Sequence, residues 1–233
     1  MRDISSIVIL TGAGISAESG LATFRGPDGL WEGHRVEDVA TPEAFVRDPA
    51  LVQAFYDARR ARLSQVEPNA AHRALARLDA EWPGELLIVT QNVDDLHERA
   101  GTGRVLHMHG ELKSAWCLAC DGRMPWEADL GDHPACPACG AVGRLRPDIV
   151  WFGEMPYEMD RIDRALMAAD LFVSIGTSGA VYPAAGFVQT ARRCGAQTLE
   201  MNLDPSLASY HFHESRTGKA GDLVLRWIDE ILT

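Results

Sequence analysis

Residues 9–17 read ILTGAGISA and follow an apolar run that begins at residue 4. The run is typical of a buried strand, and the spacing G-x-G-x-x-A is that of a loop that binds the pyrophosphate of a dinucleotide. Glycines there permit a tight turn, and the N–H groups of the next helix then point at phosphate. An ordinary strand-to-helix turn gives the same letters, so the remaining sequence has to separate the two interpretations.

Apolar runs of strand length recur along the chain and alternate with segments that carry apolar residues at helical spacing. This alternation predicts an α/β fold, in which a Rossmann-like, mostly parallel sheet carries helices on both faces. The predicted strands are 4–10, 86–90, 105–108, 148–151, 171–175 and 197–202, and the predicted helices are 49–66, 70–81, 157–168, 183–194 and 222–232.

The bulk composition limits the class of protein. The chain has 233 residues, of which 46% are hydrophobic, enough for one or two domains with a core. No apolar run is long enough to span a bilayer, and the first strand leaves no room for a targeting peptide, so we expect a cytoplasmic protein without a membrane partner. The net charge of −11 argues against a nucleic-acid partner but leaves basic peptides open.

Four of the five cysteines form two C-x-x-C pairs, Cys117 with Cys120 and Cys136 with Cys139. In a cytosolic chain, two such pairs indicate zinc and not disulfides, with a redox dithiol pair as the alternative. Four thiolates close a tetrahedral shell and leave no position for a reacting water, so we predict one structural Zn²⁺ per chain. Cys194 lies in a helical pattern and is predicted to be a packed core thiol.

Two segments interrupt the alternation of strands and helices, and they set the predicted domain organisation. Residues 1–110 and 147–233 are predicted to form the Rossmann-like, dinucleotide-binding domain, residues 111–146 a zinc-binding module, and residues 21–40 a cofactor-binding loop. An irregular stretch as long as the zinc segment needs a stabilising element, and a metal provides one.

The loop over residues 21–40 also argues against a dehydrogenase. A dehydrogenase would have a second strand ending in an acidic residue about 20 residues after the glycines. Glu32, Glu37 and Asp38 lie near that distance, but no apolar strand leads to them. Arg25 is a candidate for a phosphate contact and Phe24 for shielding a reactive sugar carbon; the alternatives are a solvated loop charge and core packing.

Six motifs follow one another along the chain: GAGISAESGLATFRG (12–26), TQNVDDLH (90–97), HMHGEL (107–112), PDIVWFGE (147–154), GTSGAVYPAA (176–185) and NLDPS (202–206). Together with the cysteine pairs, they resemble the sirtuin family of NAD-dependent protein-lysine deacylases, and in particular its bacterial class III members. The resemblance runs from residue 6 to nearly the C-terminus.

The resemblance implies a reaction that consumes NAD as a co-substrate. The acyl oxygen of a modified lysine attacks the ribose carbon that bears nicotinamide, nicotinamide leaves, and the acyl group ends on ADP-ribose as the 2′-O-acyl ester. The implied partners are acylated-lysine proteins or peptides, and we expect a monomer.

The family's catalytic histidine matches His109, an imidazole whose ordinary pKa of about 6.5 suits proton abstraction at neutral pH. The alternatives are a core histidine and His107, which would share a strand face with His109. Asn92 is the second implied catalytic residue. The implied NAD contacts are Gly12, Ala13, Gly14, Ile15, Phe24, Arg25, Gln91, Asn92, Asp94, Gly176, Thr177, Ser178, Asn202 and Ala220.

The resemblance also implies two substrate contacts. An extended peptide adds itself along Val150, Phe152 and Gly153 by main-chain hydrogen bonds. Tyr56 and Arg59 share a helix face and match the Tyr-x-x-Arg pair of class III members, which remove succinyl, malonyl and glutaryl groups.

An acidic acyl chain explains the residue types of that pair. An arginine fork accepts a carboxylate bidentately and a tyrosine hydroxyl adds another bond, while acetyl also fits. The alternatives are that Arg59 is a solvated helix charge, or that Arg60, which is also on the Tyr56 face, takes its place.

Three rival functions stay open at this point. One is the NAD-linked dehydrogenase, a second is a zinc-ribbon binding module, and a third is a sirtuin-like mono-ADP-ribosyltransferase. The last would keep His109 but would not need Tyr56 and Arg59.

Overall fold

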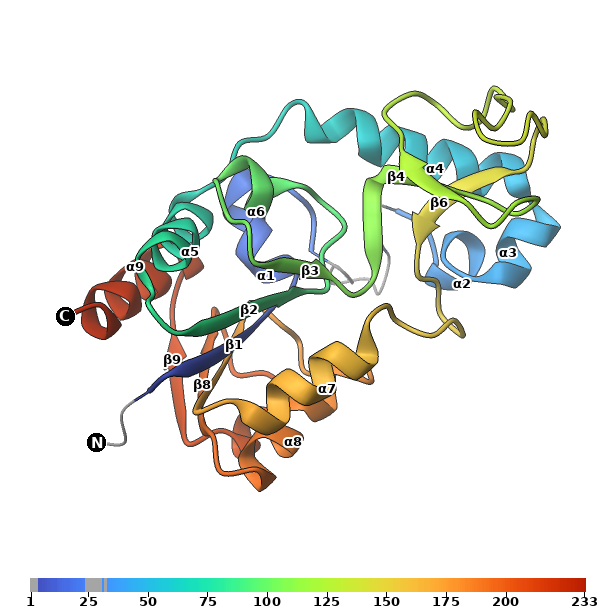
Figure 1. The fold of residues 1–233 in the computed structure, drawn as a ribbon. Coiled ribbons are helices and arrows are strands. Elements are labelled where there is room, and N and C mark those ends of the chain that lie inside the picture. Colours follow the sequence, from blue (N-terminus) through green and yellow to red (C-terminus); the bar gives the residue numbers. More distant parts are fainter. Residues whose placement is uncertain (1–3, 24–30, 32) are drawn as a thin grey trace.

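Six strands form one parallel sheet in the order β3-β2-β1-β7-β8-β9 (Figure 1). The structure is a computed structural model and describes residues 4–23, 31 and 33–233. Its strands are β1 (Ser6–Thr11), β2 (Glu85–Thr90), β3 (Val105–His107), β7 (Leu171–Ile175), β8 (Gln197–Asn202) and β9 (Glu214–Thr217).

The strand order reverses direction between β1 and β7, and this point determines where a ligand can bind. From β1 the chain builds outward through β2 to β3 on one side and from β7 to β9 on the other. The loops that follow β1 and β7 therefore diverge from one crevice at the carboxyl ends of the strands, the usual ligand site of an open α/β sheet.

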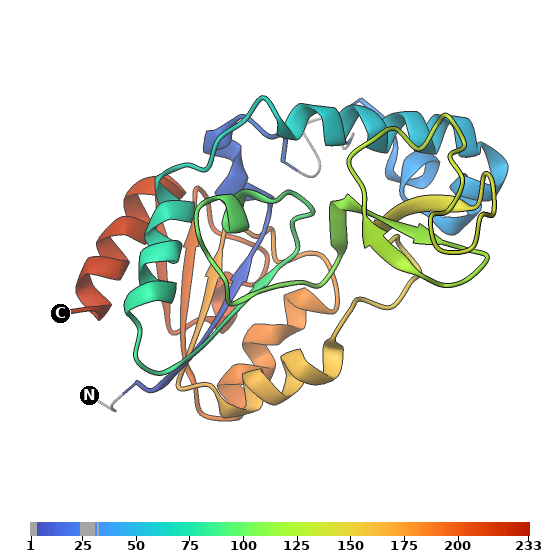
Figure 2. The same cartoon turned by 45° about the horizontal axis from the view of Figure 1, so that its top comes forward.

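Helices cover both faces of this sheet, as the sequence predicts (Figures 1 and 2). The helices of the described residues are α1 (Ala13–Ser16), α2 (Val36–Val39), α3 (Pro42–Arg47), α4 (Pro49–Leu63), α5 (Ala70–Glu81), α6 (Leu96–Arg99), α7 (Met159–Ala168), α8 (Phe187–Arg193) and α9 (Ala220–Ile231), with 3-10 turns η1 (Ala17–Ser19), η2 (Ala184–Gly186) and η3 (Ser209–His211). Helices α5 and α9 pack on one face, and α7 and α8 on the other.

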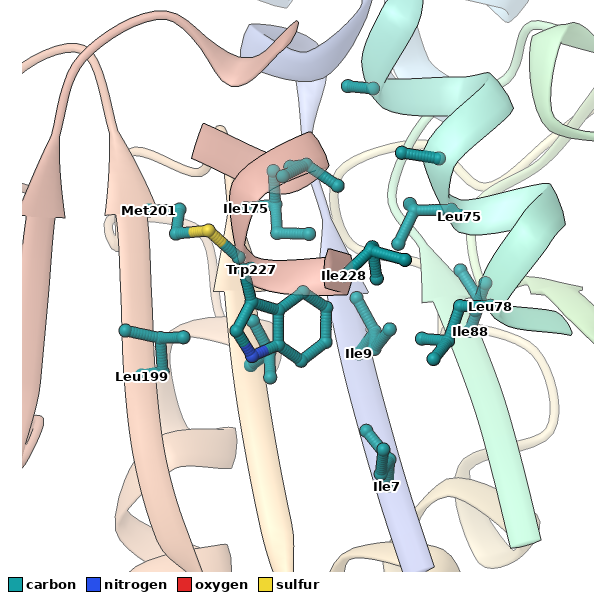
Figure 3. Close-up of a cluster of buried hydrophobic side chains, with 14 of the residues drawn as sticks. Ile7, Ile9, Leu75, Leu78, Ile88, Ile175, Leu199, Met201, Trp227 and Ile228 are labelled. Atoms are coloured by element: carbon teal, nitrogen blue, oxygen red, sulfur yellow. The ribbon is translucent and has the colours of Figure 1, made fainter. Parts of the chain in front are cut away.

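The side chains of β1 alternate between two cores. Ile7 and Ile9 face α5 and α9, where Trp227 and Ile228 of α9 lie over the strands (Figure 3). Val8 and Leu10 face the core formed with α7 and α8. Because both faces of the strand are buried, it appears in the sequence as a continuous apolar run.

A second, antiparallel sheet lies to one side, in the order β5-β4-β6. It contains β4 (Gly110–Cys117), β5 (Arg123–Pro125) and β6 (Leu145–Ile149). Helices α2 to α4 pack with β4 and β6 around a core of their own, so this lobe combines two distant parts of the chain (Figure 1). The name small lobe is used below for residues 31, 33–63 and 110–151.

Helix α4 begins as its sequence dictates. The Asp48 side chain accepts a hydrogen bond from the Leu51 N–H at 3.0 Å, and Pro49 follows at the first helical position. This cap fixes where the helix starts. Tyr56 and Arg59 lie within the helix three positions apart, so they share one of its faces.

The α/β prediction is confirmed, and several boundaries differ. The strands at 171–175 and 197–202 and the helix at 70–81 have the predicted bounds. The strand predicted at 148–151 is β6 at 145–149, and the helix predicted at 183–194 is divided between η2 and α8.

Two further predictions need correction. The predicted loop over 21–40 contains the short helix α2 at 36–39. Cys194, predicted as a core thiol, is exposed because it caps the C-terminal end of α8. No helix among the described residues is long and apolar enough to cross a bilayer.

Candidate functional site

A cavity of about 770 Å³ lies between the carboxyl ends of the parallel strands and the small lobe. This volume is typical of a small-molecule site. Residues expected from the sequence line it in three groups: Gly12, Ala13, Gly14, Gln91, Asn92, Asp94 and His109; Gly176, Thr177, Ser178, Asn202 and Ala220; and Tyr56, Arg59, Val150, Phe152 and Gly153.

Among the described residues, Ile15 is the expected residue that does not line the cavity. The Ile15 side chain is fully buried in the core against α5 and α9, so only its backbone stays near the glycine loop. Phe24 and Arg25 lie outside the described residues.

The glycines bring two backbone loops together. The Gly12 N–H donates to the Ile175 oxygen (3.0 Å) and the Gly14 N–H to the Gly176 oxygen (2.9 Å). A Cβ on Gly14 would lie 2.7 Å from the Gly176 Cα, closer than real Cβ atoms approach. The Gly14 amide is therefore used inside the protein, and the contact of Gly14 with NAD stays a prediction.

Ser16, which sequence reasoning did not assign to the site, connects Asn92 and Asp94. Its Oγ donates to Asp94 Oδ2 (3.0 Å) and accepts from Asn92 Nδ2 (3.1 Å), and all three residues are buried. Burial raises the pKa of Asp94, against the hydrogen bonds from Leu96 and Ser16. A serine that follows a turn is usually interpreted as a helix cap. The one sign of a buried role in the sequence is that Ser16 stands between two apolar residues.

The ring of His72 also contacts the Ser16 hydroxyl. Its Nε2 lies 3.5 Å from Ser16 Oγ, and its Nδ1 accepts from the Asn69 N–H. Burial lowers the pKa of His72 to about 4, so the ring is neutral and its Nε2–H faces the serine. The hydrogen bonds that join Ser16 to His72, Asn92 and Asp94 hold the Asn92 and Asp94 side chains in place at the cavity.

Hydrogen bonds distinguish His109 from His107. The Nδ1 of His109 donates to the Gln91 oxygen (3.2 Å), which leaves the lone pair on Nε2. Burial lowers the pKa of His109, although the Gln91 bond opposes this shift. His109 is therefore a neutral base at pH 7 and lines the cavity.

His107 has acceptors at both ring nitrogens. Its Nδ1 faces the Asn92 oxygen (3.1 Å) and its Nε2 the Glu98 carboxylate (2.7 Å). Burial disfavours its charged form, but the Glu98 hydrogen bond and charge outweigh burial and raise the pKa of His107. The ring serves as an ion-pair partner and is not available as a base.

Tyr56 and Arg59 of α4 both line the cavity, on the side of the small lobe. Tyr56 is fully buried, and its hydroxyl accepts a hydrogen bond from Trp151 Nε1 at 3.0 Å. The Arg59 guanidinium stacks on the Trp31 ring, 3.9 Å from the centroid. A stacked guanidinium keeps its N–H groups in the plane of its edge, the geometry that a carboxylate takes.

Arg60, the alternative to Arg59, is buried elsewhere. It pairs with Asp57 at 2.6 Å and donates to the Leu112 oxygen at 2.7 Å. The bond to Leu112 joins α4 to β4, so Arg60 supports the small lobe.

The segment after β6 is a turn, and most of its N–H groups are already bonded. Those of Val150 and Phe152 donate to the oxygens of His109 (2.9 Å) and Ala40 (3.0 Å), and that of Trp151 donates to Glu154 (2.8 Å). A peptide that pairs here has the carbonyl groups and the Gly153 N–H to use. Strand addition by a substrate peptide at this segment stays a prediction.

Asn202 at the end of β8 is held from two sides. Its Nδ2 donates to the Thr177 oxygen (2.9 Å) and to Glu200 Oε1 (3.1 Å). Glu200 is buried and also accepts from the hydroxyls of Ser206, Ser209 and Ser215. Sequence reasoning missed Glu200 because it stands inside a strand.

The four cysteines predicted as ligands come together in the small lobe. Their sulfur atoms all lie within 4.8 Å of one another, at 3.8 Å for Cys117 to Cys139 and 3.9 Å for Cys120 to Cys136. A zinc ion about 2.3 Å from four sulfurs would set them about 3.8 Å apart, whereas a disulfide needs about 2.0 Å. The donor set and its spacing fit a structural Zn²⁺.

Comparison with known sequences supports one family over most of the chain. The model of the Sir2 family matches residues 12–183. The NAD-dependent protein deacylase SIR2rp3 of Leishmania major is 57% identical over 237 residues, covering 100% of this chain and 98% of that protein. An NAD-dependent protein deacylase of Bdellovibrio bacteriovorus is 56% identical over 234 residues, covering 100% and 99%.

Solved structures are similar in the same way. A complex of a Sir2 homologue with NAD aligns with a TM-score of 0.90 and 39% identity over 99% of this chain and 92% of that one. A complex of Sir2 with a p53 peptide and NAD⁺ aligns with a TM-score of 0.84 and 29% identity over 98% and 94%.

Proposed function

The chain belongs to the Sir2 family, and we propose that it is an NAD-dependent protein-lysine deacylase that removes succinyl and malonyl groups as well as acetyl. One observation carries the proposal: a single cavity joins His109 and the loops at the strand-order reversal to Tyr56 and Arg59. The names of its relatives and the NAD complexes among similar structures support the deacylase part.

The proposed reaction uses His109 as the general base. Attack of the acyl oxygen on the ribose carbon breaks the bond to nicotinamide and forms a C–O bond. The His109 Nε2 then takes the proton of a ribose hydroxyl, whose oxygen attacks the acyl carbon. The C–N bond to lysine breaks and the amine leaves with a proton. One water then adds to the acyl carbon, and the bond between that carbon and its original oxygen breaks, so that lysine and 2′-O-acyl-ADP-ribose are the remaining products. The Gln91 hydrogen bond supports this role because it leaves the lone pair on Nε2.

Asn92 and Asp94 are proposed to hold the nicotinamide side of NAD. Asn92 contacts the ribose or a nearby water, and Asp94 the nicotinamide amide. The buried bonds through Ser16 support this division, since they fix both side chains before a ligand arrives. The other end of NAD is proposed to contact Thr177, Asn202 and Ala220.

The acidic acyl group is proposed to end at Arg59. A carboxylate in an apolar pocket would lose its hydration without replacement, at a large cost. Arg59 offers two parallel N–H donors and Tyr56 one O–H, and a hydrogen bond to a charged group contributes about 1.5–3 kcal/mol. The result is a preference of roughly 10- to 150-fold for acyl chains with a terminal carboxylate.

Acylated-lysine peptides or proteins are the proposed partners. The net charge of −11 supports a protein and not a nucleic-acid substrate. The four-cysteine cluster is proposed to hold one structural Zn²⁺ that stabilises the small lobe.

The test uses NAD and two peptides that differ only in acetyl-lysine or succinyl-lysine. Mass spectrometry follows both peptides and nicotinamide for the wild type and Arg59→Met. The proposal expects both groups to be removed, with Arg59→Met losing desuccinylation at least about tenfold more than deacetylation. If the wild type and Arg59→Met act equally on both peptides, the proposal that the enzyme removes acidic acyl groups is wrong.

The same experiment separates the rival functions. A dehydrogenase releases no nicotinamide. A mono-ADP-ribosyltransferase releases it, leaves the acyl group on the peptide and is insensitive to Arg59→Met. Nicotinamide release that requires an acylated peptide is expected only of the deacylase.

A further inference from the structure

The Tyr56 hydroxyl is constrained by the residue that binds it. Its only hydrogen-bond partner among the described residues is the indole Nε1 of Trp151, at 3.0 Å. An indole N–H can only donate, so the Tyr56 oxygen is the acceptor in this bond. The single proton of the hydroxyl must then point away from Trp151, and one lone pair is already filled.

The Trp151 indole cannot easily turn away from this position. The Arg146 guanidinium lies over its ring, 3.3 Å from the centroid, and the Phe45 ring lies 5.2 Å away. Trp151 is 2% exposed, and its backbone N–H donates to the Glu154 carboxylate. Arg146 in turn holds Glu154 through Nη1 and Nη2, at 2.7 and 3.0 Å.

The Tyr56 hydroxyl also stays protonated. Burial raises the pKa of Tyr56 to about 12, although the Arg59 charge opposes this shift. The hydroxyl is therefore a donor at any pH at which the enzyme works. Tyr56 and Arg59 line the same cavity, and the Arg59 charge is close enough to act on the Tyr56 hydroxyl.

We propose that Trp151 is a positioning residue for acyl selectivity, whose indole N–H orients the Tyr56 hydroxyl so that its proton is presented to a carboxylate bound at Arg59. The inference rests on the proposed acidic-acyl function. It assigns Trp151 an effect on the terminal carboxylate alone, transmitted through one oxygen atom, and this separates it from a packing role. A packing role would change all acyl chains of one length alike.

The test compares succinyl-lysine with butyryl-lysine peptides, whose acyl chains have the same length but end in a carboxylate or a methyl group. The ratio of their kcat/KM values is measured for the wild type, Trp151→Phe, Tyr56→Phe and the double variant. We expect each single variant to lower the succinyl-to-butyryl ratio by roughly tenfold. The double variant should fall no further than Tyr56→Phe, because Trp151 acts through the hydroxyl that is then absent.

A second replacement separates the N–H from the shape of the ring. Trp151→3-benzothienylalanine keeps the two fused rings and lacks the donor, and it should lower the ratio as Trp151→Phe does. This replacement also covers the case in which the smaller phenylalanine leaves the protein unfolded, and a melting curve monitors each variant.

Two results would overturn the inference while the proposed function stands. One is an unchanged succinyl-to-butyryl ratio with 3-benzothienylalanine in an enzyme that Arg59→Met still impairs toward succinyl. The other is a loss from Trp151→Phe that is as large in the Tyr56→Phe background as in the wild type. If the wild type does not prefer succinyl and Arg59→Met changes nothing, the proposed acidic-acyl function itself has failed and the inference falls with it.

Discussion

At the scale of single residues, two histidines two positions apart have opposite chemistry. His109 donates through Nδ1 to a backbone oxygen and keeps a lone pair on Nε2, while His107 faces the Glu98 carboxylate. The sequence motif selects His109, but only the hydrogen bonds give the reason. Ser16 and Glu200 could not be found from the sequence, because the cavity residues that bond to Ser16 lie more than 70 positions away and the partners of Glu200 are serines of the loop and strand that follow it.

The proposed role of His109 as the general base predicts the pH dependence of deacylation. Because burial lowers its pKa below 6.5, the active neutral form persists to a lower pH than for a free histidine. We expect kcat/KM to rise with pH through a single pKa below 6.5 and to be flat between about pH 7 and 8. A pH–rate profile on a saturating concentration of NAD measures this directly.

The matched variant is His109→Ala. It should lower deacylation about 10²- to 10⁴-fold while the melting temperature changes little. An acid limb centred above pH 7 in the wild type would contradict the assignment of a neutral, buried base.

At the scale of elements, the strands that are apolar throughout are predictable and the charged ones are not. Strand β7 is apolar except for one serine and has its predicted bounds. Strand β6 contains Arg146 and Asp148, both buried, with charges satisfied by Glu154 and Arg123. The apolar residues alone therefore predict a strand that begins three residues too late.

The close approach of the β1 and β7 loops predicts the effect of one added methyl group. In Gly14→Ala the new Cβ would lie 2.7 Å from the Gly176 Cα, and neither backbone can move far without breaking the bond between them. We expect the free energy of unfolding to fall by about 1–3 kcal/mol, measured by urea denaturation.

The control is Gly103→Ala, whose Cβ would make an ordinary contact 3.6 Å from Asp79. It should change the free energy of unfolding by less than about 0.5 kcal/mol. A Gly14→Ala protein as stable as this control would show that the two loops are not packed as described.

The four-cysteine cluster predicts a metal content and a dependence of the small lobe on it. Cys117→Ser should lower bound zinc from one ion per chain to none, because three thiolates do not close the tetrahedron. The melting temperature should fall by at least about 5 °C, since metal binding stabilises the fold.

Cys194→Ser is the control, because Cys194 is exposed and outside the cluster. Atomic absorption should find one zinc per chain in it, as in the wild type. Full zinc content in Cys117→Ser would refute the proposed ligand set.

At the scale of the whole molecule, the cavity joins two regions that the sequence order separates. The parallel sheet supplies His109, Asn92 and the loops at the strand-order reversal, and the small lobe supplies Arg59 and Tyr56. The sequence predicted both sets of residues. It did not predict that α2 to α4 pack with β4 and β6, because that association depends on contacts such as Arg60 to Leu112 that leave no local pattern.

The most direct test of this account follows the acyl group itself. The purified enzyme is incubated with NAD and a succinyl-lysine peptide, and mass spectrometry quantifies nicotinamide, free lysine peptide and the succinyl ester of ADP-ribose. The account predicts all three in equal amounts in the early reaction, with none in His109→Ala beyond about a hundredth of the wild-type rate. Nicotinamide release with the succinyl group still on the peptide would contradict it.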